Sequence, residues 1–198
     1  MSTALLVIDV QNGFCPGGNL AVPDGDAIVP GINALMSDFA HVILTQDWHP
    51  AGHSSFASSH PGKQPYNVIE MPYGAQVLWP DHCVQGSADA AFHSDLATDR
   101  ARAIIRKGMN PKVDSYSAFF ENDRSTPTGL EGLLRTLGVR DVTMVGLATD
   151  FCVTYSALDA ARLGFSVTLR EDLTRAIDLN GSLDAARTEM REAGVAFA

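Results

Sequence analysis

Short apolar segments alternate with amphipathic segments along this chain, and this alternation limits the fold more than any other feature of the sequence. Continuous apolar or β-branched runs predict strands at residues 4–8, 41–46, 101–107, 141–147 and 165–171, with a short last strand at 195–198. Such runs, without polar alternation, are typical of strands buried on both faces of a sheet. Helical spacing of apolar residues predicts the segments between them as helices, at 26–39, 128–138, 150–164 and 182–194.

Strands that alternate with helices favour an open, mostly parallel β-sheet flanked by helices on both faces. The length of 198 residues fits a single α/β domain spanning 1–198. Asp26 is the predicted N-cap of the first helix, with Pro30 in its first turns, and Gly138 is the predicted C′ residue of the second.

Residues 47–100 break this rhythm. The segment contains five of the six histidines, both tryptophans and many of the prolines and serines. Because a loop of this length inside a compact domain is usually functional, we expect it to carry a binding site.

Reactive side chains stand where the predicted strands end. Asp9 ends the first strand, Asp47 and His49 the second and Lys107 the third, and Cys152 begins the helix after the fourth. The carboxyl ends of parallel strands meet at one edge of the sheet, which is where ligands bind in such folds. We therefore expect these side chains to meet at one site.

Cys152 stands at a predicted helix start. Free N–H groups and the positive end of the helix dipole favour a thiolate there and can hold an oxyanion. Asp9 is a candidate acid/base, and Lys107 could keep both partners anionic. The alternatives are a buried inert cysteine, an aspartate that caps the following turn and a solvated lysine.

Asp47 and His49 are two residues apart, so their side chains point the same way, and His82 in the long loop could supply a third ligand. One carboxylate and two imidazoles suit a divalent metal, Zn²⁺ or otherwise Fe²⁺ or Mn²⁺. His53 is a weaker candidate, because Pro50 and Gly52 exclude a helical pair with His49.

Charge and cysteine content restrict the partners. The net charge of −9 disfavours nucleic acid and anionic membranes and suits a small-molecule substrate. Three widely spaced cysteines form no disulfide framework, and neither a signal sequence nor a membrane span is evident, so a reducing cytoplasm is expected. A homo-oligomer is compatible with the sequence, although no pattern encodes one.

Five motifs make the chain resemble the nicotinamidases, a group of isochorismatase-like cysteine hydrolases. They follow in the order known for that family and are LLVIDVQNGFCPGG, TQDWHPAGHSSFA, WPDHCVQGS, KGMNPKVDSYSAFF and GLATDFCVTYSALDA. The resemblance implies a parallel-sheet fold, a Cys–Asp–Lys triad, a divalent metal, and hydrolysis of nicotinamide to nicotinate and ammonia in NAD salvage. Deamidation of pyrazinamide is expected from the same resemblance.

The resemblance also implies roles for single residues. Cys152 would be the nucleophile, Asp9 the acid/base and Lys107 the supporting cation, while Asp47 and the histidines matched by the motifs would bind the metal. Those histidines are His49 and His82, and whether His53 or water completes the metal shell stays open. A cis Leu147–Ala148 bond would aim the Ala148 N–H, with that of Cys152, at the oxyanion. The expected substrate pocket consists of Phe14, Trp79, Tyr116 and Leu147.

Rival functions remain at this stage. Hydrolysis of the vinyl ether of isochorismate needs neither a thiol nor the metal loop, so Cys152 and the DWH and WPDHC motifs count against it. Hydrolysis of an N-carbamoyl amide keeps the cysteine, but the metal motif disfavours it. A non-enzymatic metal-binding or scaffold protein should show a gap in the triad or in the ligand set, and the sequence has none.

Overall fold

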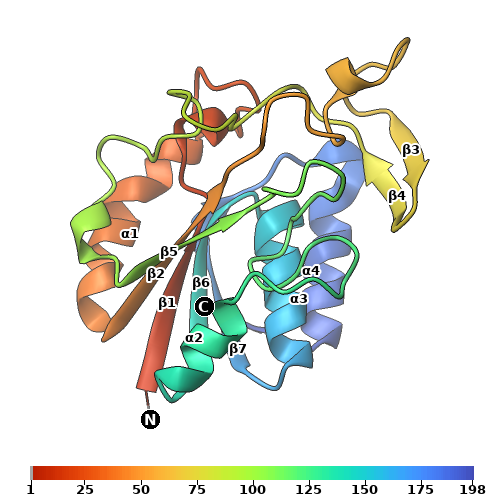
Figure 1. Cartoon of the computed structure of the whole chain (residues 1–198). Coiled ribbons are helices and arrows are strands. Elements are labelled where there is room, and N and C mark those ends of the chain that lie inside the picture. Colours follow the sequence, from red (N-terminus) through yellow and green to blue (C-terminus); the bar gives the residue numbers. More distant parts are fainter. Residues whose placement is uncertain (1) are drawn as a thin grey trace.

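The computed structural model describes residues 2–198, and its centre is a six-stranded sheet with the order β5-β2-β1-β6-β7-β8 (Figure 1). All five strand pairings in this sheet are parallel. The strands are β1 (Ser2–Ile8), β2 (His41–Asp47), β5 (Ala103–Lys107), β6 (Val139–Leu147), β7 (Ser166–Arg175) and β8 (Ala196–Phe197). The predicted parallel sheet is therefore confirmed, including the short strand at the C-terminal end.

Within residues 2–198, four α-helices cover the two faces of the sheet. They are α1 (Val29–Leu35), α2 (Leu130–Thr136), α3 (Thr154–Arg162) and α4 (Ser182–Glu192). Figure 1 shows α1 on one side of the sheet and α2, α3 and α4 on the other. From β1 to β2 the chain moves toward one edge of the sheet, and from β5 through β6 to β8 it moves toward the other edge. Because crossovers between parallel strands are right-handed, opposite directions place the connecting helices on opposite faces.

Shorter helical turns connect these elements. In the described part of the chain, a π-helical turn lies at Thr149–Val153, and 3-10 turns lie at Asn12–Phe14, Gly25–Ile28, Met36–Asp38, Ala57–Ser59, Thr98–Arg100 and Leu179–Gly181. Among residues 2–198, no helix has the length and apolar character that crossing a membrane requires.

The start of the first helix differs from the prediction. Helix α1 begins at Val29, so Asp26 is not its N-cap but an exposed residue of the preceding 3-10 turn. Ile28 and Val29 are both buried, and the tighter turn before them lets both side chains enter the core. Pro30 does lie in the first turn of α1, and Gly138, with φ +66°, follows α2 as its C′ residue.

A two-stranded hairpin interrupts the long loop and was not predicted. Strands β3 (Val68–Met71) and β4 (Gly74–Val77) pair antiparallel and lie apart from the central sheet (Figure 1). Its residues are exposed or half-buried apart from Gln76, so no apolar alternation marks the strands in the sequence.

The site lies where the strand order reverses. Strand β1 pairs with β2 on one side and with β6 on the other, so a crevice opens beyond the carboxyl ends of β1 and β6. Gly146 allows the two strands to approach, because a Cβ there would lie 2.1 Å from the carbonyl oxygen of Ile8. Its φ of +115° is also a conformation that suits glycine alone.

Candidate active site

Lys107 is the centre of a buried charge cluster. Its Nζ lies 2.9 Å from Asp9 Oδ2, 2.7 Å from Asp47 Oδ1 and 3.4 Å from Cys152 Sγ. It also donates a hydrogen bond to the Ser115 carbonyl at 2.9 Å. Burial alone lowers the pKa of Lys107, but the Asp47 and Asp9 charges raise it well above its usual range, so the amine stays protonated.

Asp9 is fully buried directly after β1, in a left-handed backbone conformation with φ +47°. Thr45 on the neighbouring strand donates a hydrogen bond from its hydroxyl to Asp9 Oδ1 at 2.6 Å. Burial raises the pKa of Asp9, and the charge of Lys107 only partly opposes this effect. An aspartate whose pKa is raised in this way is suited to accepting and returning a proton.

Cys152 lies in the π-helical turn that precedes α3, and its exposed fraction is 7%. Burial and the nearby Asp9 charge raise the pKa of its thiol well above the usual range. The Lys107 charge lowers this pKa and so favours the thiolate, as expected, but it does not offset the two raising effects. The thiol is protonated at neutral pH and needs a base to become nucleophilic.

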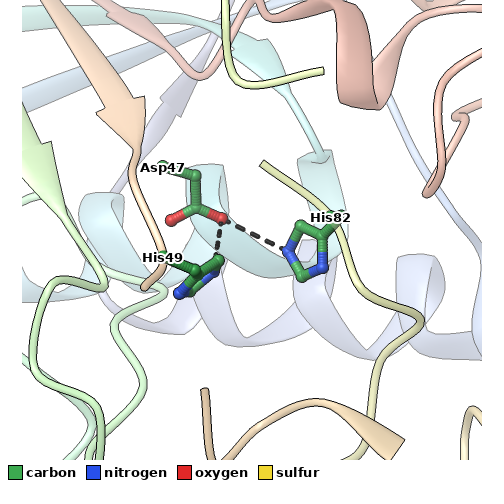
Figure 2. A group of neighbouring side chains, drawn as sticks. All are labelled: Asp47, His49 and His82. Atoms are coloured by element: carbon green, nitrogen blue, oxygen red, sulfur yellow. Dashed lines mark ion pairs between the residues drawn. The ribbon is translucent and has the colours of Figure 1, made fainter. Parts of the chain in front are cut away.

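The three predicted metal ligands lie side by side (Figure 2). His49 Nε2 is 3.2 Å and His82 Nε2 is 3.5 Å from Asp47 Oδ2, and all three residues are buried. Burial alone would raise the pKa of Asp47, but the Lys107 charge and the contact with His49 hold it well below its usual range.

Backbone carbonyls orient both imidazoles. His49 Nδ1 lies 3.0 Å from the Gly108 carbonyl oxygen and His82 Nδ1 lies 2.8 Å from that of Pro80. Because a carbonyl only accepts hydrogen bonds, both Nδ1 atoms carry a proton and both Nε2 atoms are left to bind a cation. Gly108 is needed here, since a Cβ at this position would lie 2.4 Å from the His49 ring. The donor set thus fits a divalent metal.

His53 is differently placed. Its Nε2 lies 2.7 Å from the Asn110 carbonyl oxygen, and its Nδ1 accepts the Ser55 backbone N–H at 3.1 Å. Both ring nitrogens therefore have protein partners, and the ring packs against that of His49 at 4.5 Å between centroids. His53, His49 and Asp114 lie close enough to form a second cluster of ligand type, but His53 would have to break these bonds to bind a metal.

The peptide bond between Leu147 and Ala148 is cis, as expected. Ala148 and Cys152 both line a pocket of about 330 Å³, counted out to its open mouth, next to Lys107 and Asp47.

Phe14, Trp79 and Tyr116 line the pocket, as expected for a flat ring. Leu147 does not: its side chain is fully buried and lies beside Gly25. Packing decides whether a side chain at the end of a strand faces the pocket or the core, and the motif does not contain this information.

Other lining residues were not predicted. They are Leu20, Asp114, Phe151 and Ile177, beside the predicted ligands Asp47 and His82. Phe151 precedes the predicted nucleophile, a position that could have pointed to it. Ile177 comes from the loop after β7, and only the tertiary structure brings it here: Asp150, next to Phe151, accepts its backbone N–H at 3.1 Å.

Both the sequence and the structure are similar to those of known proteins. The profile of the isochorismatase domain matches residues 3–198. The curated nicotinamidase of Acinetobacter baylyi is 55% identical over 192 residues, which cover 97% of this chain and 90% of that protein. These relationships concern nearly the whole chain rather than a single motif.

Solved structures agree with this relationship. A nicotinamidase and pyrazinamidase of Acinetobacter baumannii superposes with a TM-score of 0.98 at 56% identity, covering 99% of this chain and 95% of that one. The pyrazinamidase of Pyrococcus horikoshii in complex with zinc has a TM-score of 0.81 at 36% identity, covering 100% of this chain and 99% of that one.

Proposed function

This chain belongs to the isochorismatase-domain family, and we propose that within this family it is a nicotinamidase, a cysteine amidohydrolase that converts nicotinamide to nicotinate and ammonia. The observation that carries the proposal is the position of Lys107, whose Nζ contacts the Cys152 sulfur, the Asp9 carboxylate and the Asp47 carboxylate. The proposed nucleophile, the proposed acid/base and one proposed metal ligand thus all contact Lys107, and Cys152 and Asp47 also line the pocket.

Cys152 is the proposed nucleophile. Asp9 accepts the thiol proton as sulfur attacks the carboxamide carbon, and this transfer is needed because burial keeps the free thiol protonated. Lys107 remains charged throughout and compensates the negative charge that Asp9, Asp47 and the sulfur share. The backbone N–H groups of Ala148 and Cys152 are the proposed donors to the oxyanion.

Collapse of the tetrahedral adduct breaks the C–N bond. Asp9 returns the proton to the leaving nitrogen, which departs as ammonia and leaves a thioester on Cys152. Asp9 then removes a proton from water, whose oxygen attacks the thioester carbon. Nicotinic acid leaves and ionises to nicotinate by losing its proton to the solvent, while Asp9 returns its proton to the sulfur, so that the enzyme is restored and one water is consumed for each amide.

Asp47, His49 and His82 are the proposed ligands of one divalent metal ion, which we propose to be Zn²⁺ because the donor set suits it and a related pyrazinamidase binds zinc. Bound there, the ion would supply a Lewis-acid partner for the pyridine nitrogen and thereby orient the ring. Phe14 and Trp79 would contact the ring faces, since both line the pocket.

The same pocket should accept pyrazinamide, whose ring differs from that of nicotinamide by one nitrogen. We further propose that the protein acts in NAD salvage in a reducing cytoplasm, because a free cysteine must stay reduced to serve as the nucleophile.

The test is ammonia release from nicotinamide by the purified protein, with and without a chelator. We expect turnover that the chelator abolishes and Zn²⁺ restores. Turnover of an N-carbamoyl amide, with none on nicotinamide, would overturn the substrate assignment. Absence of ammonia from any amide by the metal-loaded protein would overturn the enzymatic function itself.

A further inference from the structure

Tyr116 separates two hollows in this protein. One is the pocket next to Cys152, and the other is a groove of about 1290 Å³, counted to its open mouth, between the β3–β4 hairpin and helix α3. Over the described residues 2–198, Tyr116 is the one side chain that lines both. Its ring lies between Phe151 on the pocket side, at 5.7 Å between centroids, and Tyr155 on the groove side, at 5.1 Å.

Two side-chain N–H groups hold the phenol in this position. Trp79 Nε1 donates a hydrogen bond to Tyr116 Oη at 3.0 Å, and Gln76 Nε2 lies 2.9 Å from the same oxygen. Tyr116 is 9% exposed, so these bonds are shielded from water and an unmade one would be costly. The wall between the two hollows is therefore fixed by Trp79 and Gln76.

Gln76 is an unusual residue for its element. It is fully buried, whereas the rest of the β3–β4 hairpin is exposed or half-buried, and Val68 is 59% exposed. A hairpin gains stability from burying an apolar side chain, so a glutamine at its single buried position indicates a role in hydrogen bonding.

The partners of Gln76 determine how its amide is oriented. Its nitrogen also lies 2.7 Å from the Val77 carbonyl oxygen and 2.8 Å from Asp114 Oδ2, and these atoms only accept hydrogen bonds. Its oxygen accepts from Tyr73 Oη and from Asn122 Nδ2, both at 3.2 Å. The nitrogen therefore faces Tyr116 as well as these two acceptors, and its two N–H groups are shared among the three.

Asn122 closes this network. Its side-chain oxygen accepts the backbone N–H of Tyr116 at 3.0 Å, while its nitrogen donates to Gln76. Gln76 thus controls the backbone of Tyr116 through Asn122 and the phenol directly. None of its hydrogen bonds reaches Asp9, Lys107 or Cys152, and of its partners Asp114 and Tyr116 line the pocket.

We propose that Gln76 is a specificity-determining positioning residue: it holds Tyr116 as the wall between the pocket and the outer groove and so restricts the substrate to one small ring. With the wall released, the pocket becomes continuous with the groove, and ring substituents gain space. This inference rests on the proposed amidohydrolase activity and adds to it the device that limits substrate size.

The experiment compares nicotinamide with two bulky analogues that carry a phenyl group at ring position 5 or 6. Gln76→Met keeps the side-chain length but removes the hydrogen bonds, Tyr116→Phe removes the phenol oxygen, and Tyr116→Ala removes the wall. For at least one analogue, we expect kcat/KM relative to that for nicotinamide to rise at least tenfold in Gln76→Met and further in Tyr116→Ala. Nicotinamide itself should show a raised KM with kcat changed less than threefold.

Gln64→Met is the matched control, because it makes the same change at an exposed position of the segment that leads into the hairpin. For both analogues, it should leave kcat/KM relative to that for nicotinamide as in the wild type. Gln76→Met combined with Tyr116→Phe should change the ratio by less than the product of the single effects, since both substitutions break the same bond.

Unchanged ratios for both analogues in all three variants, with nicotinamide turnover intact in the wild type, would overturn the inference and leave the proposed function standing. A wild type inactive on nicotinamide would instead overturn the proposed function. If Gln76→Met fails to fold, the Tyr116 variants still decide between these results.

Discussion

Lys107 Nζ lies 2.7 Å from Asp47 Oδ1, and this contact joins the proposed nucleophile to the proposed metal site. Asp47 presents its other carboxylate oxygen to His49 and His82, so one aspartate serves both clusters. A substitution in either cluster should consequently alter the charge balance of the other. A triad with an independent metal site would not show this coupling.

Replacement of Lys107 by Met should destabilise the protein strongly. Asp9 and Asp47 would remain buried without their shared cation, and breaking such a pair costs about 3–5 kcal/mol. Chemical denaturation measures the difference in free energy of unfolding. Lys112→Met is the control, since Lys112 is exposed and should change the stability by less than about 0.5 kcal/mol. Equal stabilities of the two variants would show that Lys107 does not hold the carboxylates together.

Cys152→Ala should lower ammonia release by at least about 1,000-fold, because removing the nucleophile of a covalent mechanism removes nearly all turnover. The variant should still bind nicotinamide with an affinity close to that of the wild type. Cys15→Ala, at another buried cysteine, is the matched control and should retain activity. Wild-type turnover by Cys152→Ala would refute the thioester route.

Metal content should depend on His82 and not on His53. His82→Asn should reduce bound metal from about one ion per chain to well below one, since a coordinating nitrogen is lost. His53→Asn should keep the stoichiometry, because both ring nitrogens of His53 are bonded to the protein. Elemental analysis of the purified variants gives the answer, and metal loss in His53→Asn alone would reassign the ligand set.

The acid limb of the kcat/KM profile should report Asp9. The base must be ionised to accept the thiol proton, so activity falls as the pH drops through the pKa of Asp9. Since burial raises that pKa, this fall should begin at a higher pH than for an ordinary aspartate.

Thr45→Val should move this limb further toward high pH. The Thr45 hydroxyl stabilises the ionised form of Asp9 through its hydrogen bond, and its loss raises the pKa again. Thr168→Val, at a half-buried position on β7, serves as the control and should leave the profile in place. A shift toward lower pH in Thr45→Val would contradict the assignment of the limb to Asp9.

The sequence by itself determined the strands and the order of the site residues. Apolar runs such as 4–8 and 141–147 are unambiguous because both faces of a central parallel strand are buried. Parallel strands also bring Asp9, Asp47 and Lys107 to one edge of the sheet, whatever the details of packing. The motifs also indicated a third candidate ligand in the long loop, His82, and this residue lies beside Asp47.

Only the tertiary structure decided the protonation of the site and the shape of the pocket. The pKa of Cys152 follows from burial, which depends on everything packed around the sulfur and not on its place at a helix start. Gln76 likewise belongs to a hairpin with no apolar pattern, and its role arises from contacts with Asp114, Tyr116 and Asn122, 38 to 46 residues away along the chain. Local spacing cannot encode such contacts, because they form only when distant segments fold onto one another.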